Sequence, residues 1–158
     1  MRQGRRRAGR KRNQVYISLI LKVESVKPSY TFSINRACDG GRYSEHAALE
    51  LRTTITAPAL YALRAANFAL MADRRQSAAS AGASESREEP IAVASFSTRG
   101  KDDIQILGSV PYDAFAPLAF GLATNALPWI VLRGPAPKWG HGRIESMHFA
   151  SDVDPDEW

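Results

Sequence analysis

Three residues near the C-terminal end have the types and the spacing that acid and base chemistry requires. His141, Arg143 and Glu145 lie two positions apart in the segment HGRIESMH. Residues two apart in a regular strand project from one face, so these side chains are predicted to lie together, with His148 on the opposite face. A histidine and a carboxylate can exchange protons with a phosphodiester while an arginine stabilises its charge, as in a small hydrolase or nuclease. An exposed polar strand face explains the same spacing, and we favour it over catalysis.

Other reactive side chains give weaker signals. A metal could draw on His46, His141, His148 and Glu145, but no pair has a recurrent ligand spacing, so we expect no metal site and no cofactor. Cys38 lies in a glycine-rich turn next to a carboxylate, which opposes thiolate formation and therefore a nucleophilic role. The glycine-containing segments match no phosphate-binding motif, so nothing in the sequence supports nucleotide binding.

Trp139 lies in the segment GPAPKWGHG, residues 134–142, whose prolines and glycines are incompatible with regular secondary structure. If the indole is exposed beside these rigid prolines, it forms a preformed contact for a partner or ligand. The alternative is that Trp139 folds back and covers the core.

The basic residues are concentrated at the start of the chain. The first 12 residues contain seven of the 21 lysines and arginines and no acid, so the remainder has 14 basic against 16 acidic residues, a balance of −2. We expect this segment, the basic arm (residues 1–14), to be disordered in isolation and any weak, sequence-indifferent nucleic-acid affinity to reside in it. A solvated tail without a partner and a mis-chosen start codon that adds residues the cell does not make are the competing interpretations, and we favour these over binding. The residues that would contact phosphates are Arg5, Arg6, Arg7, Arg10, Lys11 and Arg12.

Hydropathy patterns predict the elements that position these residues. Alternating apolar residues indicate strands at 15–26, which Pro28 should end, and at 30–37 and 43–56, which should form a hairpin with one wet face. Residues 59–75 follow a proline, are rich in alanine and leucine, and predict a helix. Residues 76–90 contain no large apolar side chain and predict a surface loop.

The second half repeats this order. Strands are predicted at 91–98 and 104–110, followed by a helix that starts near Pro117, because proline is tolerated in a first helical turn. Residues 129–132 are apolar without alternation, which is typical of a strand buried on both faces, and a last strand is predicted at 143–150. The predicted fold is therefore α+β, a mainly antiparallel sheet of about six to seven strands covered by two helices, in the order βββαββαββ.

Length and composition are those of one globular domain, predicted at residues 15–150, between the basic arm and an acidic tail at 151–158. A single cysteine excludes an internal disulfide and suggests a reducing, cytoplasmic location, and no apolar run is long enough to span a bilayer. We interpret the protein as a non-catalytic binding or interaction module for another macromolecule. The hydrolase and the nucleic-acid-binding arm are the two alternatives.

Overall fold

The computed structural model describes residues 15–35, 42–58, 64–73, 93–98 and 103–154. These residues form eight strands, all in one sheet, and one helix. The elements are Tyr16–Asn35 (β1), Arg42–Ala57 (β2), Ala65–Asp73 (β3), Ala94–Ser97 (β4), Asp103–Pro111 (β5), Tyr112–Ala123 (α1), Trp129–Pro135 (β6), His141–Ile144 (β7) and Ser146–Ala150 (β8).

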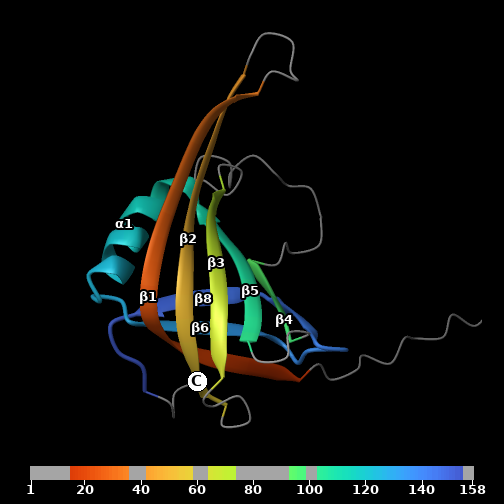
Figure 1. The fold of residues 1–158 in the computed structure, drawn as a ribbon. Coiled ribbons are helices and arrows are strands. Elements are labelled where there is room, and N and C mark those ends of the chain that lie inside the picture. The colour runs from red at the N-terminus through yellow and green to blue at the C-terminus, as the bar shows by residue number, and fades with distance from the viewer. Residues whose placement is uncertain (1–14, 36–41, 59–63, 74–92, 99–102, 155–158) are drawn as a thin grey trace, which may run out of the picture.

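The sheet curves so strongly that its two edge strands come close together. Its strand order is β7-β4-β5-β3-β2-β1-β6-β8, so β7 and β8 form opposite edges. Only Glu145 separates these two strands along the chain, and the sheet is therefore nearly closed into a barrel-like shape. In Figure 1, β6 and β8 cross behind the long strands β1, β2 and β3. Where β6 passes β7, a Cβ atom on Gly134 would collide with the carbonyl oxygen of Arg143, so the two backbones are in direct contact.

Alternating side chains fill the interior of this curved sheet. On β2, Leu49, Leu51 and Ile55 are buried while His46 and Arg52 are exposed, which confirms the predicted wet face of the first hairpin. The core also contains side chains from β1, β3, β4, β5, β6 and β7. The helix α1 packs onto it through Phe115, Leu118, Ala119 and Leu122, whose spacing places them on one side of the helix.

The predicted fold class is wrong in three respects. The described residues form eight strands rather than six to seven, one helix rather than two, and the order βββββαβββ. The error lies in the predicted helix at 59–75, because Ala65–Asp73 is a strand between β2 and β5, and residues 59–63 and 74–75 lie outside the described part. β3 also pairs in parallel with β5, the one departure from antiparallel pairing among the described strands.

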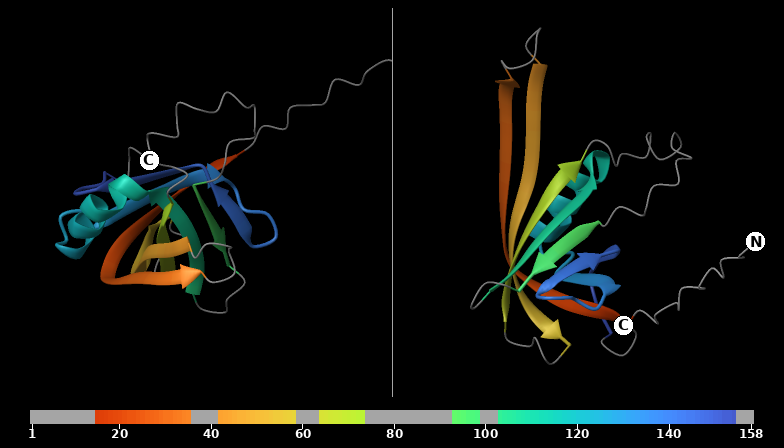
Figure 2. Two further views of the ribbon diagram at one scale, coloured as in Figure 1. Left: turned by 90° about the horizontal axis from the view of Figure 1, so that it is seen from above. Right: turned by 90° about the vertical axis from the view of Figure 1, so that its right-hand side faces the viewer.

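β1 does not end at Pro28. It continues to Asn35, with Pro28 opposite Leu49 of β2. The other neighbour of β1, the strand β6, pairs only with Tyr16–Lys22, so Pro28 lies on an open edge, where a missing backbone donor is tolerated. Figure 2 shows the distal parts of β1 and β2 extending beyond the rest of the sheet as a two-stranded ribbon.

Two further boundaries differ from expectation. The helix begins at Tyr112 instead of near Pro117, and Pro117 lies exposed inside it. The last strand is divided at Glu145 into β7 and β8, whose backbone partners are β4 and β6. The division has the geometry of a β-bulge, because Arg133 of β6 pairs with Ser146 and its carbonyl oxygen also accepts a hydrogen bond of 2.9 Å from the Glu145 N–H.

Candidate functional site

The structure brings two of the three predicted catalytic residues together. Arg143 Nη2 lies 2.9 Å from Glu145 Oε1, and the hydroxyl of Tyr16 donates a hydrogen bond of 2.8 Å to Glu145 Oε2. Tyr16 begins β1, and its backbone pairs with Pro135 of β6. The cluster therefore depends on the contact between the start of the domain and its last strands.

These contacts fix the protonation state of the carboxyl group. The hydrogen bond from Tyr16, and then that from Arg143, lowers the pKa of Glu145. The same bond to a carboxylate raises the pKa of Tyr16. An efficient general base has a pKa near the operating pH, so a carboxylate whose pKa is lowered is a weak base at neutral pH. Glu145 is thus held as an ionised hydrogen-bond acceptor for its two neighbours.

We expect Tyr16→Phe to raise the pKa of Glu145 towards its ordinary value. In the wild type, the contacts of ionised Glu145 stabilise the fold fully at any pH above the ordinary carboxyl pKa. That stabilisation is lost as the pH falls through the lowered pKa of Glu145 in the folded protein. Removing the hydroxyl moves that loss to higher pH. A carbon-13 NMR titration of the carboxyl group measures the shift, with Tyr30→Phe on the projecting ribbon as the control. An unchanged Glu145 titration in Tyr16→Phe would contradict the assigned hydrogen bond.

His141 does not join the cluster of Tyr16, Arg143 and Glu145. Gly142 and Ile144 face the core, where a Cβ on Gly142 would collide with the ring of Phe96, so His141 and Arg143 point outward as predicted. The residue that pairs with His141 on the neighbouring strand β4 is Ser97. His148 also points outward, because Met147 and Phe149 pack on the core, and the prediction that it lies on the opposite face is wrong. The bulge at Glu145 reverses the alternation.

A continuous line of polar side chains crosses six adjacent strands on the outer face of the sheet. Each residue is the direct partner of the next in the sheet register, and the alternating residues on the inner face are buried. We call this set the polar row: Ser25 (β1), Arg52 (β2), Asn67 (β3), Gln105 (β5), Ser97 (β4) and His141 (β7). With strands about 4.8 Å apart, the row is about 24 Å long.

The polar row lines two adjoining hollows. One has a volume of about 420 Å³ and includes Arg52, Asn67 and Gln105. The other, of about 300 Å³, includes Gln105 and His141. Asn67 donates a 3.1 Å hydrogen bond to Asp103 Oδ2, whereas within the described residues the Arg52 guanidinium and the Gln105 amide have no partner. The row therefore offers uncommitted donors and acceptors along a shallow groove.

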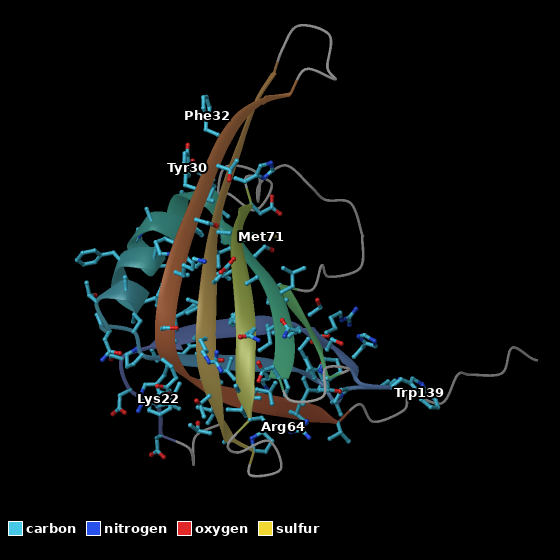
Figure 3. The ribbon with its side chains drawn as sticks, in the orientation of Figure 1. Lys22, Tyr30, Phe32, Arg64, Met71 and Trp139 are labelled. Carbon is cyan, nitrogen blue, oxygen red and sulfur yellow. The ribbon has the colours of Figure 1, made fainter. Side chains whose placement is uncertain are left out.

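Trp139 is exposed to solvent, so the alternative in which its side chain covers the core is wrong. Its side chain is 93% exposed. Lys138 and His141 exchange two backbone hydrogen bonds of 2.9 and 3.0 Å around Trp139 and Gly140. The two central residues have φ angles of 56° and 78°, the positive values of a type I′ hairpin turn. Figure 3 shows Trp139 extending from one end of the molecule, and we call residues 138–141 the Trp139 turn.

The remaining candidate residues are not brought into a site. Arg5, Arg6, Arg7, Arg10, Lys11 and Arg12 of the basic arm, and also Cys38, lie outside the described residues. Among the residues that the structure describes, no three histidine, cysteine, aspartate or glutamate side chains gather closely enough to hold a metal ion.

Sequence reasoning missed Tyr16 and the polar row. No local signal identifies Tyr16, because its role depends on pairing with a strand more than a hundred residues away along the chain. Four members of the row lie in segments that were predicted to be strands, whereas Asn67 lies in the predicted helix at 59–75 and His141 lies in the segment 134–142. Their alignment could not be predicted, because it requires the parallel pairing of β3 with β5, and β3 was predicted to be a helix.

Comparisons with protein-family profiles, curated proteins and solved structures found no significant match. In the described part of the chain, the helix is too short to cross a membrane.

Proposed function

We propose that the protein is a non-catalytic binding module that contacts another macromolecule through the outer face of its sheet. The observation that carries this proposal is the polar row, which lines two adjoining hollows and contains uncommitted side chains. His141 is both the last member of the row and the last residue of the Trp139 turn. The groove therefore ends at the base of the turn that carries the exposed indole.

The hydrolase alternative has less support. It requires His141, Arg143 and Glu145 to act on one substrate, yet Glu145 is bonded to Arg143 and Tyr16, and no hydrogen bond among the described residues joins it to His141. Glu145 also has a lowered pKa, which disfavours a proton-transfer role near neutral pH. A cytoplasmic location forms part of the proposal and rests on the single cysteine in the sequence.

Site-specific photocrosslinking tests the binding surface. We expect p-benzoylphenylalanine in place of Gln105 to give a discrete covalent adduct after irradiation in cells that produce the protein naturally. Adding Arg52→Ala should remove that adduct, because the guanidinium, two strands from Gln105 in the row and lining the same hollow, supplies a charge-assisted contact. Gel electrophoresis of the tagged protein measures both outcomes.

The matched control places the same photocrosslinker at Phe120, which is 71% exposed on α1. An identical adduct pattern from Phe120, or no adduct from Gln105, would contradict the proposal. Turnover of bis(p-nitrophenyl) phosphate that disappears in Glu145→Gln would instead favour the hydrolase.

A further inference from the structure

The projecting ribbon of β1 and β2 has an open edge. β2 pairs with one side of β1 as far as Asn35, whereas on the other side β6 pairs only with Tyr16–Lys22. Beyond that pairing, the N–H of Val23 donates a 2.8 Å hydrogen bond to the carbonyl oxygen of Pro128, just before β6. From Glu24 to Asn35, the backbone groups that point away from β2 therefore pair with no described strand. We call this stretch the free edge, and it is about 40 Å long.

One face of the free edge is apolar. Alternate side chains along it point to the same side of the sheet as the core, and these are Val26, Pro28, Tyr30 and Phe32. Val26 packs partly against the core, but farther along the ribbon Tyr30 is 62% and Phe32 is 60% exposed. Figure 3 shows both rings on the side of β1 that faces away from β2. Two aromatic side chains thus occupy core-facing positions while remaining largely in solvent.

A ribbon of this kind favours the addition of a third strand. Two antiparallel strands alone are marginally stable in water. Natural proteins usually keep edge strands short, charged or covered, because a long open edge pairs readily with another strand. The free edge contains only two charged residues, Glu24 and Lys27, and Lys27 lies 3.8 Å from Glu50 of β2. Pro28 removes one backbone donor, and the other outward-pointing groups of the free edge stay available.

We propose that the protein forms a homodimer in which the free edges of two copies pair antiparallel, across a two-fold axis that passes through Ser29. A two-fold axis perpendicular to the joined sheet keeps each face on the same side in both copies, so apolar residues meet apolar ones. Val26 then lies opposite Phe32 of the second copy, and Pro28 lies opposite Tyr30 of the second copy. Such apolar cross-strand pairs stabilise a sheet.

The length of the free edge selects this register. With the axis at Ser29, Asn35 of the second copy lies opposite Val23, where Pro128 becomes the neighbour of β1. Pairing therefore extends along the whole free edge and stops before β6. Moving the axis one residue towards the N-terminus would place Asn35 of the second copy opposite Leu21, which already pairs with β6.

A hollow between β1 and α1 lies where this register delivers an aromatic side chain. Its volume is about 170 Å³, and it is lined by Val26 and its neighbours on β1 and by Leu122, Ala123 and Asn125 at the end of α1. Phe32 of the second copy, opposite Val26, points to the side of the sheet on which α1 packs. An aromatic anchor in a pocket is the usual centre of a protein interface. The two-fold axis repeats the contact, so each copy supplies one ring and one hollow.

The buried area is sufficient for a stable dimer. The paired edges, about 40 Å long and about 10 Å thick, and the exposed parts of four aromatic rings together bury about 1,300 Å². Stable interfaces bury about 1,200–2,000 Å² in total. Because each face keeps its side, the polar rows of the two copies lie on one face of the joined sheet. The inference does not depend on the function proposed for that row.

Single cysteines test the register. In a chain with Cys38→Ser, Ser29→Cys should form an intermolecular disulfide when oxidised with copper–phenanthroline. Residues that pair directly have Cα atoms about 4.5–5.5 Å apart, within the range of a disulfide. Thr31→Cys is the matched control, because residue 31 is also exposed on the same face, but its two copies lie about 14 Å apart in this register. Non-reducing gel electrophoresis measures both outcomes.

Phe32→Glu tests the anchor. It places a charge in the hollow, so the dissociation constant of the dimer, measured by sedimentation velocity with the full chain, should rise at least about 30-fold, as for a hot-spot residue. Because Phe32 is 60% exposed in the single chain, the variant should keep the wild-type circular dichroism spectrum. Trp139→Asp is the control at an exposed aromatic residue well apart from Phe32 in Figure 3, and it should leave the dissociation constant unchanged.

Three outcomes would overturn the inference. One is a chain that stays monomeric at about 100 μM, above the dissociation constants usual for an interface of this size. The second is a disulfide that forms as readily through Thr31→Cys as through Ser29→Cys, which would indicate another register or random collision. The third is a dimer that Trp139→Asp weakens and Phe32→Glu does not, which would assign the interface to the Trp139 turn. None of them decides the role of the polar row, which the photocrosslinking experiment tests separately.

Discussion

Gly134→Ala is expected to destabilise the protein by more than about 3 kcal/mol, or to prevent folding, because the added methyl group has no space. Its Cβ would overlap the backbone carbonyl oxygen of Arg143, and its next neighbours are also backbone atoms of Arg143 and Ile144. Backbone atoms cannot move aside as a side chain can. Relief therefore requires β6 and β7 to separate, which disturbs the closure of the sheet. Chemical denaturation followed by circular dichroism measures the loss.

Gly121→Ala is the matched control. Gly121 is also buried, but there the nearest atom to the added methyl group is Cδ1 of Leu127, the flexible end of a half-buried side chain, at 2.6 Å. Alanine also favours the helix by up to about 1 kcal/mol over glycine. We expect a net change within about 1 kcal/mol. Equal stability of both variants and the wild type would show that β6 and β7 do not approach as closely as the structure indicates.

The sequence was sufficient for strands that contain several large apolar side chains. On β2 the alternation of Leu49 and Leu51 with Glu50 and Arg52 predicts both the strand and its buried face. On β6 the unbroken run around Ile130 predicts an interior strand, and it does lie between β1 and β8. The large apolar side chains of these segments are buried in only one strand orientation, so their pattern determines which face lies in the core.

β3 could not be predicted in this way because alanines occupy both of its faces. Ala66 is fully buried while Ala65 and Ala69 are half-buried, so small side chains conceal an alternation that only Phe68 and Leu70 display. Alanine also has the highest intrinsic helix propensity, and this local preference is overridden by pairing with β2 and β5. The missing strand changed the predicted sheet, its order and the count of helices.

The candidate site could be predicted only where local alternation along a strand determines which way its side chains point. The two-residue spacing correctly places His141 and Arg143 on the outer face, because β7 is regular. Beyond it, the bulge at Glu145 reverses the alternation, which a sequence period does not reveal, and Tyr16 enters through long-range pairing. Trp139 was identified from its proline- and glycine-rich segment, but its exposure required the geometry of the turn.

Deleting residues 1–12 is expected to abolish any affinity for single-stranded RNA, because the alternative of nucleic-acid binding assigns that affinity to the basic arm alone. The deleted segment contains seven basic residues and no acid, and the remainder of the chain has a balance of −2. For single strands the slope of log affinity against log salt is about −0.7 for each phosphate neutralised, so losing seven contacts reduces the slope by about 5. Anisotropy titrations at several salt concentrations measure this slope for the full and shortened chains.

The same deletion should leave the melting temperature nearly unchanged, because apart from Met1 the segment has no large apolar side chain whose burial could stabilise the fold. If the shortened chain still bound RNA with an unchanged slope, the cations responsible would belong to the folded domain, and the polar row around Arg52 would be the surface to mutate next.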